Sequence, residues 1–273
     1  MVPKSEPISP SQFRPSLLES WRIQRRVIWA LVLREILTRY GRHNIGFLWL
    51  FAEPLLFTVA ITALWTATKA VHGSNLPIVA FAVTGYSSVL LWRNMPSRCI
   101  KALEPNLSLL YHRNVRPIDI YLARLLLEVA GASCSFAVLV VFFHFLGWLE
   151  YPEDILQVAA GWCMLAWFGG ALALFVGALS EHAESVEKLW HPTAYILFPL
   201  SGAAFIVDVL PHQAQRYVLL LPMVHGVEFL REGYFGSRIV AHYDMAYMAF
   251  INTVLTVLGL AQTRKVSRTA VPE

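Results

Sequence analysis

The chain has 273 residues, of which 56% are hydrophobic and only 15% are charged, and its formal net charge is +4. Soluble globular domains carry roughly 25% charged residues. The composition therefore excludes an ordinary water-soluble domain and indicates a protein embedded in a lipid bilayer.

The N-terminal segment, residues 1–43, is polar and basic, and it predicts a cytoplasmic region with one surface helix. It contains no apolar core of the length that a signal peptide needs. The helix is expected over residues 17–40, and its apolar side consists of Leu17, Trp21, Ile28 and Val32. A basic amphipathic helix that precedes a membrane span is expected to lie in the lipid headgroup layer. A solvated cytosolic helix is the alternative.

The first apolar run, Ile45–Thr68, follows the basic segment directly and predicts the first membrane span. Glu53 and Pro54 interrupt this run. A charged side chain and a missing backbone donor both cost free energy at membrane depth, so the pair predicts a position lined by protein or water. An ordinary span with a proline kink is the alternative.

Further apolar runs predict five more spans, because about 20 apolar residues cross the hydrocarbon core as a helix. These runs are Leu76–Trp92, Val129–Trp148, Ile155–Leu179, Pro192–Val207 and Tyr243–Ala261. The second run is rather short and ends at Arg93. The expected fold is therefore an all-α membrane protein with six transmembrane helices.

The distribution of Lys and Arg predicts the orientation of these spans. Basic residues are concentrated before the first span, in the loop after the second span and in the C-terminal tail. Cytoplasmic loops retain such residues, so both termini are expected to face the cytoplasm. The predicted organisation is a cytoplasmic region over residues 1–43, a membrane domain over residues 44–262 and a cytoplasmic tail over residues 263–273.

The cytoplasmic segment Asn106–Pro117 combines leucines with a polar and basic rim. Pro105 and Pro117 bracket it, as expected of a short helix between two breaks. Its candidate contact residues are Leu107, Leu109, Leu110, Tyr111, His112, Arg113 and Arg116. Leucines of this kind can fill a groove on a partner protein. The residues alone support only a basic loop that holds lipid phosphates.

The second cytoplasmic segment, residues 181–188, carries acids and a histidine, but not in a spacing that ligates metal. Glu184 with Lys188, and Glu187 with His191, suit pairing across one turn of a helix. The three cysteines, Cys99, Cys134 and Cys163, are scattered in or beside spans and predict neither disulfides nor a metal site. We expect a polar helical turn and no bound metal.

Residues 207–243 form neither a span nor a hydrophilic domain. The run Tyr217–Val224 is about 12 Å long as a helix, which is too short to cross the membrane. Prolines and glycines divide the region further. Re-entrant or interfacial helices are expected here, and two surface hairpins are the alternative.

The sequence lacks the motifs of an enzyme. It contains no Gly-x-x-x-x-Gly-Lys-Ser/Thr segment to hold nucleotide phosphates and no Gly-x-Ser-x-Gly nucleophile. The chain is therefore not expected to bind or hydrolyse a nucleotide itself. An intramembrane enzyme that uses Glu53 or His144 is a distant alternative, because no paired catalytic motif accompanies either residue.

The start of the first span carries a motif made of the basic run Arg39-Tyr40-Gly41-Arg42, followed by Gly46, Trp49 and Pro54. This motif resembles the permease subunit of polysaccharide-exporting ABC transporters, the KpsM/Wzm type, and most closely the capsular polysaccharide exporters of Gram-negative bacteria. The resemblance covers nearly the whole chain. Exporters of O-antigen and teichoic acid share much of the motif and stay open as an alternative.

The resemblance implies an ABC-type-2 permease fold with gate helices after the fifth span. It implies an inner-membrane homodimer with two copies of an ABC ATPase, which hold the ATP and Mg, so that this chain itself carries no cofactor. The segment Asn106–Pro117 would be the helix that couples to the ATPase. Periplasmic co-polymerase-type and outer-membrane export proteins would be further partners, and nucleic acid would not.

The expected substrate is a lipid-linked acidic capsular polysaccharide. The candidate residues where it enters or is anchored are Arg39, Tyr40, Arg42, Trp49, Arg93 and Arg98. The candidate aromatic residues of the channel, on which sugar rings would stack, are Trp92, Trp162, Trp167, Tyr195 and Phe205. Interfacial aromatic belts and the retention of basic residues in the cytoplasm explain the same side chains without a substrate.

Overall fold

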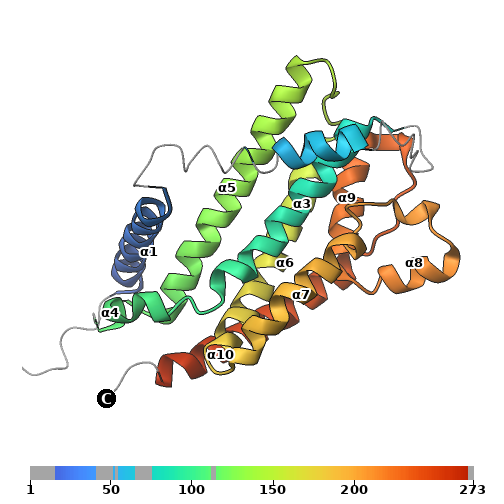
Figure 1. Cartoon of the computed structure of the whole chain (residues 1–273). Helices are drawn as coiled ribbons and strands as arrows, with labels where there is room; N and C mark the ends of the chain where they lie inside the picture. The colour runs from blue at the N-terminus through green and yellow to red at the C-terminus, as the bar shows by residue number, and fades with distance from the viewer. Residues whose placement is uncertain (1–15, 41–51, 53–54, 65–75, 112–114, 270–273) are drawn as a thin grey trace, which may run out of the picture.

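The computed structural model describes residues 16–40, 52, 55–64, 76–111 and 115–269, and all regular structure in these residues is helical (Figure 1). The longer helices are α1 (Leu17–Tyr40), α3 (Ile78–Cys99), α5 (Pro117–Phe145), α6 (Ile155–Ser180), α7 (Glu184–Leu200), α9 (Pro222–Phe235) and α10 (Met245–Thr269). The short helices are η2 (Glu104–Asn106), α4 (Leu107–Leu110), η3 (Val207–Val209), α8 (His212–Val218) and η4 (Gly236–Arg238). An apolar helix also spans Leu55–Leu64.

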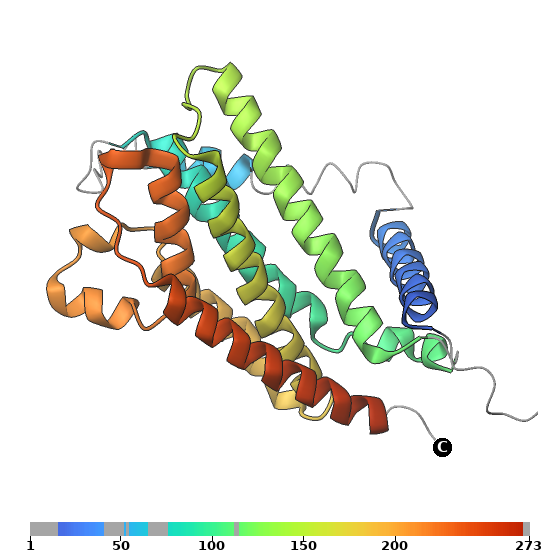
Figure 2. The ribbon, with the colours of Figure 1, turned by 180° about the vertical axis from the view of Figure 1, so that it is seen from behind.

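Helix α6 lies at the centre of the bundle and packs against α3, α9 and α10 (Figures 1 and 2). Glycines on α6 allow the close approach of α3. A Cβ atom at Gly169 would lie 2.8 Å from Cα of Trp92, and one at Gly177 would lie 2.8 Å from Cβ of Cys99. Larger residues at these two positions would push the two helices apart.

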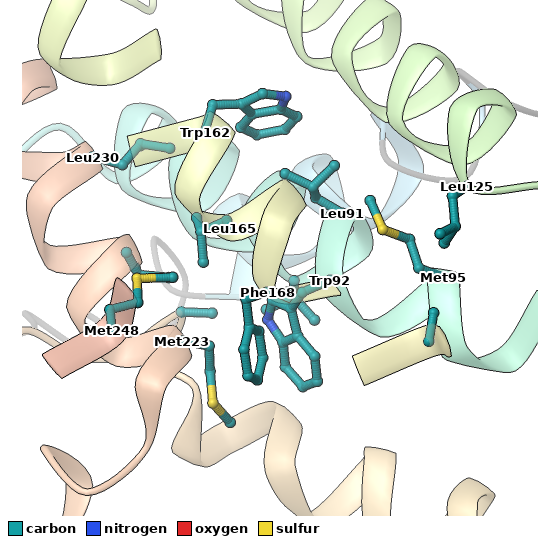
Figure 3. Close-up of a cluster of buried hydrophobic side chains, with 14 of the residues drawn as sticks. Leu91, Trp92, Met95, Leu125, Trp162, Leu165, Phe168, Met223, Leu230 and Met248 are labelled. Carbon is teal, nitrogen blue, oxygen red and sulfur yellow. The ribbon is translucent and has the colours of Figure 1, made fainter. Parts of the chain in front are cut away.

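The main core forms around α6 from large apolar side chains of several helices (Figure 3). The indole of Trp92 on α3 lies against the ring of Phe168 on α6, with 6.1 Å between the ring centroids. Met223 of α9 and Met248 of α10 close the cluster on the other side and are almost fully buried. The core therefore joins α3, α6, α9 and α10 into one unit.

Among the described residues, the three helices α5, α6 and α10 are long and apolar enough to cross a membrane. Most residues in the apolar windows of α5 and α10 are not buried, whereas α6 is largely enclosed. An apolar surface of this size on a long helix is expected to face lipid. The bundle is thus a membrane domain with α6 inside and with α5 and α10 at its periphery.

Helices α5 and α6 show how the predicted spans compare with the structure. The prediction for α6, Ile155–Leu179, ends one residue before the helix does. The predicted span begins at Val129, whereas the helix begins at Pro117. The first turns of the helix carry polar residues that face α1, so they do not belong to the apolar run. Hydropathy alone does not detect a helical segment of that kind.

The predicted fifth span, Pro192–Val207, is wrong in its boundaries. Helix α7 begins at Glu184 and ends at Leu200, and acidic residues occupy its first turn, where they favour a helix start. The chain then turns at Gly202, whose φ of +82° is a conformation that glycine adopts without strain. The apolar residues after this turn therefore do not continue the helix.

Residues 207–238 form η3, α8, α9 and η4, and α9 is deeply buried. The predicted run Tyr217–Val224 falls across the break between α8 and α9. Met223, Val227 and Leu230 of α9 have almost no exposed surface and pack against α6 and its neighbours. This burial excludes a surface hairpin for α9.

Two other predictions concern the ends of the membrane domain. Helix α10 continues to Thr269, so the segment predicted as a tail from residue 263 begins inside a helix. Glu53 and Pro54 lie outside the described residues, and only residue 52 and the helix Leu55–Leu64 represent the predicted first span.

Candidate functional site

The segment predicted to couple to a partner presents only some of its leucines. Leu107 is 48% exposed and Tyr111 is 78% exposed, whereas Leu110 is only 6% exposed and packs in the main core. Leu109 is half-buried and Arg116 is exposed. Leu110 is therefore not part of the exposed surface of this segment, because its side chain packs in the bundle.

His112 and Arg113, from the same predicted set, lie outside the described residues. The exposed part of this region defines what we term the coupling surface, which consists of Leu107, Tyr111 and Arg116. It combines an apolar, an aromatic and a basic side chain at one end of the bundle.

The loop that precedes α4 is fixed to the C-terminal end of α6. The backbone N–H of Lys101 donates to Oγ of Ser180 at 3.1 Å, and that of Leu103 donates to Oε1 of Glu181 at 3.1 Å. Burial raises the pKa of the Glu181 carboxyl, while the N–H of Leu103 and the charge of Lys101 act in the opposite direction. The loop before α4 is therefore tied to the C-terminal end of α6.

The same segment is also tied to α1. Asn106, which directly precedes α4, donates from its side-chain nitrogen to the carbonyl of Ala102 at 2.8 Å. Its side-chain oxygen accepts a hydrogen bond from Arg34 of α1. Asn106 is buried, so this bond is shielded from water. Helices α1, α4 and α6 are thereby linked at one end of the molecule.

Helix α1 is held to the bundle by a group of charged residues that we term the ion network, namely Glu35, Arg39, Arg98, Arg124 and Glu128. Arg39 pairs with Glu128 of α5, and with Glu35 at 3.0 Å. Nε of Arg98 lies 3.4 Å from Glu128, and Nε of Arg124 lies 3.4 Å from Glu35. Three arginines thus share two carboxylates, which leaves one net positive charge.

The ion network changes how the predicted substrate residues are understood. Arg39 is largely buried between two carboxylates, and Arg98, although more exposed, pairs with Glu128. Burial lowers the pKa of Arg39, but Glu128 and Glu35 together raise it more, so its net shift is upward. Arg42 and Trp49 lie outside the described residues, as does the side chain of Tyr40.

The outer face of α1 carries both apolar and basic side chains. Trp21, Trp29, Leu33 and Leu37 are exposed, and so are Arg22, Arg25 and Arg26. Of the predicted apolar stripe, Leu17 and Trp21 are exposed, Ile28 is half-buried and Val32 is buried against the bundle. A helix that presents tryptophans, leucines and arginines outward suits the headgroup layer of a membrane.

A second arrangement, which we term the aromatic face, lies between the helix Leu55–Leu64, α3 and α7. It consists of Phe57, Tyr86, Arg93, Tyr195 and Phe198. The rings of Phe57 and Tyr86 stack with centroids 3.7 Å apart, and Phe198 meets both edge-on. The guanidinium of Arg93 lies 6.0 Å from the ring centroids of Tyr195 and Phe198.

Two openings flank the aromatic face. An apolar cavity of about 210 Å³ is lined by Phe57, Tyr86 and Phe198. A smaller cavity of about 100 Å³ is lined by Arg93, His191 and other residues of α3 and α7. The face therefore offers aromatic rings beside one cation, which suits a ligand with apolar sugar faces and a negative charge. Sequence reasoning identified Arg93 and Tyr195 but missed the other three rings.

Two of the tryptophans predicted to line the channel, Trp92 on α3 and Trp162 on α6, are packed inside the protomer. Trp92 is fully buried against Phe168 (Figure 3). Trp162 stacks on Phe136 with 4.7 Å between centroids, and its indole N–H donates to Ser133 at 2.8 Å. Trp92 and Trp162 are therefore buried in the protomer and do not present their rings at its surface.

The other predicted channel aromatics differ in their exposure. Trp167 donates a hydrogen bond to Oγ1 of Thr256 on α10 at 3.1 Å. Phe205 is half-buried in a small cluster beside η3. Tyr195 is 72% exposed on α7 and belongs to the aromatic face. Tyr195 alone of this set projects from that face.

A fully buried arginine, Arg231 of α9, joins α3, α7 and α9. Its guanidinium donates to the carbonyls of Gly202 at 2.5 Å, Ala203 at 2.6 Å and Phe205 at 2.7 Å. It also lies 3.8 Å from the ring centroid of Phe81 on α3. We term this arrangement the buried arginine site. It holds the turn after α7 against α9.

Glu228, one helical turn before Arg231, completes the polar interior of this region. Its carboxylate accepts the backbone N–H of Val207 at 3.3 Å and that of His242 at 3.2 Å. The connection before α8 and the one before α10 are thereby fixed to α9. Sequence reasoning missed both residues, although an acid and a base three residues apart in an apolar segment signal a functional or structural site.

His144, considered as a catalytic residue, has a structural role in the turn after α5. Its Nδ1 lies 2.9 Å from the carbonyl oxygen of Leu149, and its ring lies 3.8 Å from that of Tyr151. In the described part of the chain no group of three or more potential metal ligands occurs. This environment offers His144 no carboxylate partner for acid–base chemistry.

Comparison with known proteins places these features in context. Residues 26–235 match a family model described as ABC-2 type transporter. The chain is 45% identical over 260 residues to the capsule polysaccharide export inner-membrane protein CtrC of Neisseria meningitidis serogroup B, which covers 95% of this chain and 98% of the relative.

Two further relatives carry related names. The capsule polysaccharide export inner-membrane protein BexB of Haemophilus influenzae is 42% identical over 255 residues, covering 93% of this chain and 96% of the relative. The polysialic acid transport protein KpsM of Escherichia coli is 26% identical over 246 residues, covering 89% and 95%. Each similarity extends over nearly the full length of both proteins.

Proposed function

This chain belongs to the ABC-2 type transporter family, and from that membership we propose that it is the permease subunit of an ABC exporter for capsular polysaccharide in the bacterial inner membrane. The observation that carries the proposal is the 45% identity, over nearly the whole chain, to a protein named for capsule polysaccharide export. The long apolar helices α5, α6 and α10 agree with a membrane location.

The energy for export would come from a separate ATPase, because the sequence has no nucleotide-binding motif.

We propose a homodimer of this chain with two ATPase subunits, since two protomers related by a twofold axis give a closed assembly. Six spans per protomer, with Ile45–Thr68 as the first, and cytoplasmic termini are part of the proposal. Basic residues on the side of α1 and α4 support this orientation.

The coupling surface would receive the motion of the ATPase. ATP binding would bring the two ATPases together and displace α4. The hydrogen bonds to Ser180 and Glu181 would pass that displacement to α6, and the bond from Arg34 would pass it to α1. The buried helix α9 and the neighbouring α8 would then act as the gate on the opposite side.

The substrate would be a lipid-linked, acidic polysaccharide. Its sugar rings would stack on the aromatic face, where Tyr195 is exposed and Arg93 supplies a positive charge. Stacking is tolerant of sugar identity because it uses the C–H face of a ring, so a repetitive polymer could slide along it. Periplasmic and outer-membrane export proteins would carry the polymer onward.

A deletion strain tests the proposed function. Loss of this chain should abolish surface capsule and cause a glycolipid to accumulate on the cytoplasmic side, and a plasmid copy should restore export. Normal capsule in the deletion strain would contradict the proposal. An accumulating glycolipid with the structure of O-antigen or a teichoic acid precursor would instead identify the neighbouring class of cargo.

A further inference from the structure

A groove at the end of the molecule that carries α1 and α4 is unrelated to the aromatic face. It has a volume of about 780 Å³ and lies between the start of α5 and the last turns of α10. We term it the basic groove. Its principal lining residues are Arg116, Ile118, Leu260, Arg264, Lys265 and Arg268.

The α10 wall of the basic groove changes from apolar to basic along one face of the helix. Val257, Leu260, Arg264 and Arg268 are spaced by three or four residues and therefore lie above one another. Val257 is 60% exposed and Leu260 is 42% exposed. With a rise of about 1.5 Å per residue, Val257 and Arg264 are about 10 Å apart. An apolar surface thus lies directly below a cationic one.

The charge of the basic groove is one-sided. Arg116, Arg264, Lys265 and Arg268 line it, and among the described residues no acidic side chain belongs to its lining. Asp119, on the first turn of α5, is buried, accepts the backbone N–H of Arg116 at 2.9 Å and offsets part of the charge of Arg116, but it is not among the lining residues of the groove. Within the described ranges, Arg264 and Arg268 form no ion pair with an acid.

We propose that the basic groove binds one anionic phospholipid of the cytoplasmic leaflet. Arg264, Arg268 and Arg116 would contact the phosphate, and an acyl chain would lie along Val257 and Leu260. Clusters of basic residues at the cytoplasmic end of a span attract anionic headgroups. A soluble protein would satisfy the cations but not the apolar wall, which lies on the periphery of a spanning helix.

This proposal rests on the membrane orientation given under the proposed function, but not on the cargo. The basic groove is built by α5 and α10, whereas the aromatic face is built by α3, α7 and the helix Leu55–Leu64. Helix α6 separates the two (Figures 1 and 2). The bound lipid would therefore be a structural or regulatory ligand, not the lipid anchor of the exported polymer.

The test uses the full chain purified from membranes, with any subunit that co-purifies, and titrates phosphatidylglycerol while native mass spectrometry counts bound lipids. One phosphatidylglycerol should bind at least roughly tenfold more tightly than phosphatidylethanolamine, whose headgroup has no net charge. The double variant Arg264→Gln with Arg268→Gln should weaken binding by roughly 30-fold, because each basic residue contributes about fivefold.

Two control variants keep the result interpretable. Arg216→Gln removes an exposed arginine from α8, away from the groove, and should leave lipid binding unchanged. Arg264→Lys with Arg268→Lys retains both charges and should bind within about threefold of the wild type. If the Gln variant loses the lipid but the Lys variant binds it, a folding defect does not explain the loss.

Four results would overturn the proposal. The first is normal binding of phosphatidylglycerol by the Gln double variant. The second is competition by glycerol phosphate, which has no acyl chains, as strong as that by the lipid, and it would identify a site for a free phosphate. Loss of a co-purifying subunit with unchanged lipid binding would identify a protein-docking surface. Displacement of phosphatidylglycerol by the lipid-linked glycan would assign the groove to the cargo. Failure of export in cells with lipid binding intact would count against the proposed function only.

Discussion

The buried arginine site and the ion network both hold helices of this molecule together, and they differ in what surrounds their arginine side chains. Arg231 is fully buried and donates mainly to backbone carbonyls of the turn after α7. Arg39 is also largely buried, but it shares two carboxylates with two other arginines. The buried arginine site has no substitute donor if its cation is removed, whereas the ion network retains two cations.

This difference explains why one cluster is expected to determine the fold and the other to permit movement. Buried carbonyls that lose their donor keep the full cost of desolvation. In the ion network each carboxylate faces two arginines, so the loss of one arginine leaves every carboxylate with a partner. We infer that α9 is fixed to α7 and α3, while α1 can shift on α5 during a transport cycle.

The largest effect is expected from Arg231→Met, which keeps the length of the side chain but removes its donors. At least three buried carbonyls lose their hydrogen bonds, so the free energy of unfolding should fall by roughly 3–5 kcal/mol. Thermal unfolding of the detergent-purified chain measures this loss, with Arg216→Met as the exposed control. A variant as stable as the control would remove the distinction between the two clusters.

A smaller loss is expected from Gly85→Ala on α3, which tests the same site without removing a charge. The new Cβ would lie 2.4 Å from the carbonyl oxygen of Ala203 and 2.6 Å from Nη2 of Arg231. Overpacking of this kind costs about 1–3 kcal/mol. Gly170→Ala on α6 is the matched control, since its Cβ would meet only Leu125 at 3.8 Å. Equal stability of the two alanine variants would contradict the packing around Arg231.

In the ion network, Glu128→Gln should cost only about 1–2 kcal/mol, although it removes the carboxylate that Arg39 and Arg98 share. Arg98→Gln should cost less than about 0.5 kcal/mol, because its side chain is 55% exposed and Glu128 keeps Arg39. Thermal unfolding at low and high salt measures both values. A Glu128→Gln variant that loses as much stability as Arg231→Met would show that the network is not redundant.

A similarly small effect on stability is expected from Leu107→Asp on the coupling surface, because this side chain is exposed. Binding should respond strongly, because co-purification of the ATPase should be lost. The melting temperature should stay within about 2 °C of the wild type, which corresponds to a loss of less than about 1 kcal/mol in the free energy of unfolding. Leu110→Asp should do the reverse and destabilise the chain, since Leu110 is in the core. An ATPase that still binds the Leu107→Asp variant would argue against this coupling surface.

The sequence was most informative where one local property decides the structure. Helix α6 was predicted nearly to the residue because a long apolar run follows Asp154, whose side chain accepts the N–H of Gln157 at 3.0 Å as an N-cap. Helix α7 was misplaced by several residues because polar first turns and the turn at Gly202 set its limits, and a hydropathy window detects neither.

The site was less predictable because its partners lie far apart in sequence. Arg39 was expected to meet an anionic substrate, but its carboxylate partner Glu128 is 89 residues away and appears only in the folded chain. Trp92 was predicted to line a channel, but the glycines of α6 allow α3 to approach closely, so Trp92 packs in the core. Composition indicates that aromatic and basic residues are abundant; the packing decides which of them are exposed.

The central claim is that this chain forms the path for the polymer and that a separate subunit supplies the energy. The most direct measurement is ATP hydrolysis together with movement of lipid-linked polysaccharide in proteoliposomes that contain the chain with or without its ATPase. The account predicts neither activity for the chain alone and both for the complex. Hydrolysis of ATP by the chain alone, or a complex that hydrolyses ATP without moving the polymer, would contradict it.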